Sequence, residues 1–251
     1  MTYIRPIIIA VGLIAVWQMI IMITGVQNFI LPPPASVAIA LFEKLDIVAG
    51  HAWITLSEMV IGLILGTLLG TTTALIIGYF RTAHQWLIPV LVISQAIPVF
   101  AIAPILVLWL GYGIGSKVAM ATIIIYFPVT AAFYDGLRRT DPEHLELAYT
   151  MSASRWAILY HIRIPAALPS FASGMRVAAA VAPIGAVVGE WVGSSQGLGF
   201  LMLHANGRLQ IDVMFAALLV LSIMAIGLYF SVDLAMRRLV QWQPETQPSS
   251  D

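Results

Sequence analysis

The pattern of hydrophobic and polar positions divides the chain into long apolar segments separated by short polar ones. The six apolar segments cover residues 7–24, 54–79, 86–110, 116–136, 171–192 and 212–236. A helix needs about 20 apolar residues to cross a bilayer. The segments do not alternate with the period of two that is typical of membrane barrel strands. The pattern therefore predicts an all-α integral membrane protein with about six transmembrane helices.

The first apolar segment could be a secretory signal peptide because Arg5 precedes it, but the segment is 18 residues long. No small-x-small cleavage site follows at Thr24-Gly25-Val26. We therefore interpret this segment as a retained span rather than a cleaved signal.

The composition agrees with a membrane protein. Hydrophobic residues make up 60% of the chain and charged residues 10%, whereas soluble domains carry roughly 25% charged residues. The net charge of zero gives no indication of nucleic-acid binding. The chain has no cysteine, and its five histidines are scattered, so we expect no metal site and no cofactor.

The distribution of basic residues predicts the orientation in the membrane. With the N-terminus inside, eight basic residues fall on the cytoplasmic side and three outside. The inner set is Arg5, Arg81, Arg138, Arg139, Arg155, Arg163, Arg237 and Arg238, and the outer set is Lys44, Lys117 and Arg208. Arg176 is expected at the inner end of the fifth span. By the positive-inside rule, both termini and the polar loop at 137–170 are expected on the cytoplasmic side of the membrane.

Three regions follow from the segment order. Residues 1–50 form a first span and an outer segment in which three prolines precede an amphipathic helix from Ser36, its N-cap, to about Val48. Residues 51–238 form the transmembrane core, including a polar loop at 137–170. Residues 239–251 form a polar tail.

Glycines recur every four residues in two spans. The second span carries Gly62, Gly66 and Gly70, and the fifth carries Gly185 and Gly189. Such stripes let helices approach closely in lipid. We favour packing within the chain over a dimer interface.

Several residues inside the spans are candidates for a translocation pathway or gate. Gln95 and Pro98 lie in the third span, Pro183 in the fifth, and Glu190 and Trp191 near its outer end. Broken helices at membrane depth are tolerated against protein or a water-filled cavity, but simple kinked packing explains the prolines equally well. For Glu190 a solvated interfacial acid is the alternative to a gate.

The polar loop between the fourth and fifth spans is the most informative segment. Asp141-Pro142 predicts a helix start, with Glu143 in the first turn. Ser152-Ala153-Ser154 interrupts the helix, and either serine can cap a second one. Pro165 and Pro169 are expected to punctuate the return into the membrane. A solvated linker would not need this helix punctuation.

The loop resembles the EAA signature of ABC-importer permeases. Glu146-Leu147-Ala148 stands for Glu-Ala-Ala, Ser152 for the glycine six residues after the glutamate, and Ile162-Arg163-Ile164-Pro165 for the ending Ile-x-Leu-Pro. Leu147 and Ser152 depart from the pattern. Because serine accepts a left-handed turn less readily than glycine, the loop after Ala148 is expected to differ in shape.

The resemblance covers most of the chain and is greatest to the nitrate, sulfonate and taurine subfamily of type I permeases. Residues 176–195 are similar to permeases for hydroxymethylpyrimidine, a thiamine precursor. The resemblance implies a permease homodimer bound to two cytoplasmic ATPase subunits and served by an extracytoplasmic solute-binding protein. The coupling residues it implies are Glu143, Glu146, Leu147, Ala148, Tyr149, Ser152, Ile164 and Pro165.

Function and cargo are open to alternatives. The chain has no phosphate-binding Gly-x-x-x-x-Gly-Lys-Ser/Thr motif, so ATP hydrolysis is expected in a separate subunit and the chain itself is not an enzyme. An ion-coupled carrier is the second hypothesis, although midplane carboxylates and clear repeats are missing from the pattern. A membrane enzyme is the weakest. The cargo is expected to be hydroxymethylpyrimidine, with nitrate, sulfonate or taurine as alternatives.

Overall fold

The fold is that of a computed structural model, which describes residues 4–242 apart from the side chains of residues 4–7 and of Gln95. Within this range every regular element is a helix. The helices are α1 (Ile4–Thr24), α2 (Pro34–Glu43), α3 (Leu45–Tyr79), α4 (Arg81–Ala96), α5 (Val99–Leu110), α6 (Ile114–Arg138), α7 (Pro142–Thr150), α8 (Arg155–Ile158), the π-helical turn η1 (Leu159–Arg163), α9 (Ile164–Gly193), α10 (Leu198–Gly207) and α11 (Ile211–Leu239). The all-α prediction is confirmed.

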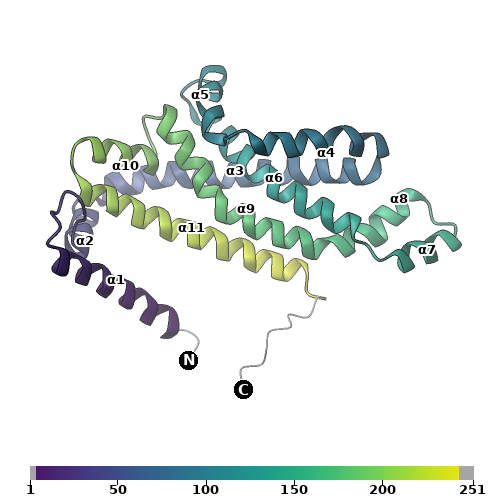
Figure 1. Cartoon of the computed structure of the whole chain (residues 1–251), viewed down its shortest axis with the longest axis horizontal. Helices are drawn as coiled ribbons and strands as arrows, with labels where there is room; N and C mark the ends of the chain where they lie inside the picture. Colours follow the sequence, from purple (N-terminus) through teal and green to yellow (C-terminus); the bar gives the residue numbers. More distant parts are fainter. Residues whose placement is uncertain (1–3, 243–251) are drawn as a thin grey trace.

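Long helices run side by side in a bundle, and short helices lie at its two ends (Figure 1). Four stretches are long and apolar enough to cross a membrane: α3, α6, α11 and the continuous helix Arg155–Gly193. The pair α4 and α5 would make a fifth. The expected first span corresponds to α1, whose part with described side chains, Ile8–Thr24, is a shorter apolar helix.

The third apolar segment is broken rather than straight. Helices α4 and α5 meet at an angle of 100°. Pro98 is the N-cap of α5, whereas Pro89 and Pro104 lie inside helices. The bend therefore falls at Pro98, whose missing N–H and ring prevent the helix from continuing.

The outer segment differs from its prediction. Helix α2 begins at Pro34 with Pro33 as N-cap, not at Ser36, because proline at the first helical position needs no N–H partner. The helix ends at Glu43, and Val48 is already buried in α3. Since α3 starts at Leu45, the boundary expected at residue 50 falls inside this helix without a break.

The bundle is centred on α6, which packs against α3 on one side and α9 on the other. A Cβ on Gly62 of α3 would lie 2.5 Å from the Ala121 side chain, and a Cβ on Gly185 of α9 would lie 2.6 Å from the Ala121 Cα. Both glycine stripes thus serve close helix approach within the chain, as favoured from the sequence.

The two ends of the bundle carry different elements. Helices α7 and α8 project beyond one end, and α2 and α10 lie at the other, where α1 also ends (Figure 1). The polar tail lies outside the described residues from residue 243 on.

Candidate functional site

Helix α7 forms where the sequence predicts it. The Asp141 side chain accepts a hydrogen bond of 3.0 Å from the backbone N–H of Glu143, and Pro142 occupies the first turn. The carboxylate thereby satisfies a backbone donor that the helix leaves unpaired and lies at the positive end of the helix dipole. This cap fixes the start of a nine-residue helix outside the bundle.

The turn after α7 has the shape that glycine favours, although serine occupies it. Ser152 has φ of 59°, in the left-handed region. The N–H of Ala153 donates to the carbonyl of Ala148 at 3.0 Å, and the N–H of Ser152 to that of Tyr149 at 3.0 Å. This is the hydrogen-bond pattern of a Schellman-type helix end. The expected change in loop shape is therefore wrong, because the carbonyls at the helix end bind these two N–H groups and hold Ser152 in its left-handed conformation.

The return to the membrane is a continuous helix, contrary to prediction. Ser154 caps α8 by accepting from the N–H of Ala157 at 3.2 Å, and α8 runs through η1 into α9. The Ile164 N–H bonds the Leu159 carbonyl, one residue further back than in an α-helix. Such a wider turn makes room for Pro165 and its missing N–H. Pro169 lies inside α9 without ending it.

Helix α7 presents an apolar face to solvent. Exposed fractions are 60% for Leu147 and 75% for Met151, whereas Tyr149, 57% exposed, does not line this surface and faces a different cavity. Ala148 is the one buried residue of α7. An open groove of about 550 Å³ lies between the two helices, with Leu147 and Met151 on one side and Ala157 on the other. We call this surface the α7 groove.

The structure gathers most of the expected coupling residues, but not all. Glu143 and Glu146 are exposed on α7, although neither lines the α7 groove. Ile164 and Pro165 are partly buried at the base of α9, where Ile164 packs against a core cluster that includes Leu137. Both residues therefore belong to the packed base of α9 and do not lie on the exposed face of α7.

The expected pathway residues fall into separate settings. Pro98 marks the α4–α5 break, and Pro183 is buried within α9. Trp191 is 43% exposed on the surface of α9. The side chain of Gln95 lies outside the described residues. Their role in a pathway stays a prediction.

Glu190 is buried and caps a helix. It is 1% exposed, so the interpretation as a solvated interfacial acid is wrong. Its Oε1 accepts a hydrogen bond of 2.6 Å from the Thr55 hydroxyl, and its Oε2 accepts one from the backbone N–H of Gly199. The N–H of Leu198 donates to Thr55 Oγ1 at 2.8 Å, and that of Gly197 to His51 Nδ1 at 2.9 Å. Side chains of α3 and α9 thus hold the start of α10.

Two further charged side chains are buried in the same half of the bundle. Glu58 and Lys117 are each 1% exposed. Lys117 donates to the carbonyls of Tyr112 at 2.5 Å, of Gly113 at 3.0 Å and of Gly193. Lys117, which the sequence analysis counted among the outer basic residues, is therefore buried, and these carbonyls replace water around its ammonium.

The partners of Glu190 were missed from the sequence. The sequence around His51 and Thr55 contains no pattern that marks either residue as a partner of Glu190. The presence of Glu58 and Lys117 inside apolar segments was the one usable signal, since charges at such positions are costly unless paired.

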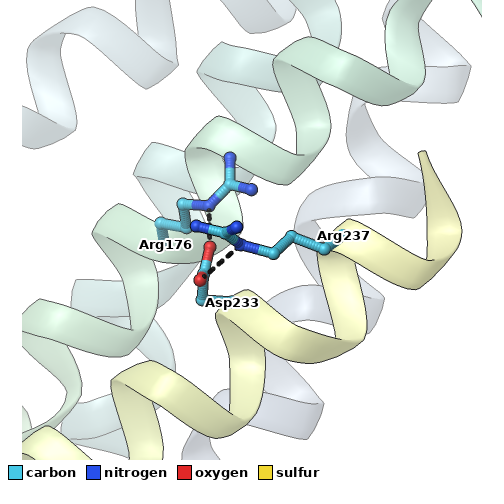
Figure 2. A network of polar contacts seen from close by, with 3 residues as sticks. All are labelled: Arg176, Asp233 and Arg237. Atoms are coloured by element: carbon cyan, nitrogen blue, oxygen red, sulfur yellow. Dashed lines mark hydrogen bonds and ion pairs between the residues drawn. The ribbon is translucent and has the colours of Figure 1, made fainter. Parts of the chain in front are cut away.

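A second polar cluster joins α9 to α11 (Figure 2). Asp233 accepts from Arg176 Nε at 2.6 Å and from Arg237 Nε at 2.9 Å. Arg176 lies well inside α9, because the helix extends back to Ile164. The carboxylate side chain is only 14% exposed, so this ion pair fixes the two helices together.

Comparison with known proteins identifies the chain. It matches the family described as binding-protein-dependent transport system inner membrane component over residues 62–243, which include α7 and its groove. The chain belongs to this family of ABC-transporter permeases. The gradient-driven carrier and the membrane enzyme are therefore not supported, and the chain is a multi-pass inner-membrane transport component.

Three relatives of this permease cover nearly all of it. It is 52% identical over 236 residues to a probable ABC transporter permease protein of Haemophilus influenzae, covering 94% of this chain and 96% of the relative. It is 34% identical to the formylaminopyrimidine transport permease ThiX of Halalkalibacterium halodurans, covering 95% and 96%. It is 36% identical to the riboflavin transport system permease RibX of Chloroflexus aurantiacus, covering 92% and 87%.

The fold is also that of a solved importer. A chain of the MetNI methionine ABC transporter in an inward-facing conformation matches with a TM-score of 0.68 at 18% identity, covering 78% of this permease and 98% of that chain. The type I importer permease fold is therefore confirmed.

Proposed function

We propose that α7 is the coupling helix of this permease and that its groove receives a cytoplasmic ATPase subunit. The observation that carries the proposal is the exposed apolar face of α7 on a helix fixed at both ends. Its start is capped by Asp141, and its end is closed by the turn at Ser152. Exposed apolar surface of this kind is typical of protein interaction sites.

The path from α7 into the bundle supports the same role. Helix α8 continues through η1 into α9 as one helix from Arg155 to Gly193. Helix α9 in turn packs against α6 and α11. A displacement of the α7–α8 unit by the ATPase therefore moves α9 directly, as expected for rigid-body rocking.

The orientation follows from the proposal and from charge. With α7 in the cytoplasm, the end of the bundle that carries Arg138, Arg139 and Arg155 faces inward. Both termini are then cytoplasmic, and α2 and α10 lie at the outer side, where a solute-binding protein delivers cargo. We propose a homodimer as the complete pathway, as the resemblance to type I permeases implies.

For the cargo we propose a small heterocycle, with hydroxymethylpyrimidine or a related thiamine precursor first. The support is the 34% identity over nearly the full length to a permease named for formylaminopyrimidine. A permease named for riboflavin, which is also a heterocycle, is 36% identical to this chain. Permeases for aliphatic sulfonates and taurine are 27% identical, which makes sulfonate, taurine and nitrate the alternatives.

The test is reconstitution with the ATPase and binding protein encoded beside the gene. Hydrolysis in liposomes is measured against hydroxymethylpyrimidine, riboflavin, taurine and nitrate. Glu146→Lys should reduce cargo-stimulated hydrolysis at least tenfold, about 1.4 kcal/mol of lost coupling, while the permease still reaches the membrane.

Glu43→Lys is the matched control for this test. It reverses the same charge on an exposed residue of α2, at the opposite end of the bundle. Measured without the binding protein, which is proposed to dock on this outer side, its recruitment of the ATPase and its basal hydrolysis should equal those of the wild type. Normal stimulation in the Glu146 variant would refute the assignment of α7.

A further inference from the structure

A second cavity lies on the other face of the α7–α8 unit and is strongly basic. It encloses about 420 Å³ between the end of α3, the start of α4, the end of α6 and α8. Four arginines line it: Arg81, Arg138, Arg155 and Arg163. Tyr79, His84, Tyr134 and Tyr149 complete its polar wall. Among the described residues that line it, none is acidic.

The positive charge of this cavity is largely uncompensated. Arg138 forms an ion pair with Asp135 at 3.4 Å, but both side chains are about half exposed or more, so this pair is weak. Arg163 Nε is buried and has no hydrogen-bond partner within the described chain. Gathering guanidinium groups without an acid is unfavourable unless an anion joins them.

The chemistry of the lining fits a phosphate group. Guanidinium groups bind phosphate oxygens through paired N–H donors, and the tyrosine hydroxyls add further donors. The ring of His84 packs against that of Tyr134 at 5.7 Å, which fixes part of the wall. Several N–H and O–H donors around one cavity suit a compact tetrahedral anion.

The surroundings favour a lipid as the source of this phosphate. Beside the cavity, Phe80 is 55% exposed and Trp86 on α4 is 74% exposed. A basic cavity next to exposed apolar and aromatic side chains at the end of a bundle is the arrangement that binds anionic headgroups at a membrane surface. The α7 groove lies on a separate face and is lined mostly by apolar side chains.

We propose that this cavity is a binding site for a phosphate group, supplied by the headgroup of an anionic phospholipid. The site does not depend on the assignment of the coupling helix. A bound headgroup would neutralise the arginines where α3, α4, α6 and α8 meet and would hold these helix ends together.

The lipid arm of the test uses native mass spectrometry. The permease is released from nanodiscs of phosphatidylcholine and phosphatidylglycerol in equal parts, alone and in the assembled transporter. The wild type should retain one phosphatidylglycerol per chain. Arg81→Gln and Arg163→Gln should each weaken retention of the lipid about fivefold. This is the contribution to binding expected of one basic residue near an anionic surface.

The control for this arm is Arg139→Gln, which removes an exposed arginine at the same end of the bundle that does not line the cavity. It should retain the lipid. Arg81 is exposed at the start of α4, so we expect Arg81→Gln to fold. The test therefore remains valid if Arg163→Gln does not fold.

A second arm separates a lipid from free phosphate. Inorganic phosphate is titrated against the permease in phosphatidylcholine nanodiscs while thermal unfolding is followed. Stabilisation that Arg81→Gln abolishes, without lipid selectivity, would support the site with free phosphate as its source. No response to lipid or phosphate, equal loss in Arg139→Gln, or loss of the lipid on assembly with the ATPase would overturn the proposal.

Discussion

The buried hydroxyl of Thr55 allows a sharp test of how α10 is held. Thr55→Val keeps the volume of the side chain but removes the donor to Glu190 Oε1 and the acceptor of the Leu198 N–H. Both residues are buried, with Thr55 and Leu198 at 0% exposure, so water cannot replace either bond. The variant isolates the hydrogen bonds from packing.

The expected loss follows from these two bonds. An unpaired buried N–H costs about 1–3 kcal/mol, and a hydrogen bond to a carboxyl group contributes about 0.5–3 kcal/mol across its neutral and ionised forms. Because the two share one hydroxyl, we expect about 3 kcal/mol in total rather than their sum. For a chain of this size, that lowers the midpoint of thermal unfolding by roughly 6–12 °C.

The assay is thermal unfolding of the purified permease, with hydrogen exchange of residues 195–203 as a local measure. Thr72→Val is the control, since Thr72 is exposed in the same helix and its hydroxyl bonds only the Leu68 carbonyl at 2.7 Å. It should unfold within about 0.5 kcal/mol of the wild type. If both variants unfold alike, or if exchange at α10 is unchanged, the cap at Glu190 does not hold α10.

Three further changes probe other parts of the chain. Gly185→Ala should lower stability by about 1–3 kcal/mol in thermal unfolding, because its new methyl would meet the Ala121 backbone. Asp233→Asn should lower stability by about 1 kcal/mol, measured in the same way, since it weakens the ion pair between α9 and α11. Ser152→Gly should stabilise the turn after α7 by about 0.5–1 kcal/mol, seen as slower hydrogen exchange of residues 147–155.

Each of these changes has its own contrast. Gly227→Ala, where a Cβ meets nothing within 4 Å, should be neutral or slightly stabilising. Asp135→Asn, which affects only an exposed pair, should change stability by less than about 0.5 kcal/mol. Faster exchange in the Ser152 variant would show that the left-handed turn does not strain the serine.

The elements predicted from local patterns were largely correct. The Asp141-Pro142 start of α7 was predictable because capping depends on neighbouring residues alone. The break at Pro98 was a candidate for the same local reason. Local patterns gave wrong predictions at two places. The helix continues through Pro165, because the π-helical turn before it leaves room for the proline, and α2 begins at Pro34 rather than at Ser36.

By itself, the sequence determined that this permease is a helical membrane protein and where the polar loop before α9 forms a helix. These properties follow from hydrophobic run length and from capping, which act over a few residues. Only the tertiary structure decided that Glu190 is a buried cap for α10 and that Lys117 is enclosed by carbonyls. It also brought Arg81 and Arg163 to one cavity from different helices. Such sites depend on which helices pack together, and helix packing depends on many contacts between residues that are far apart in the sequence.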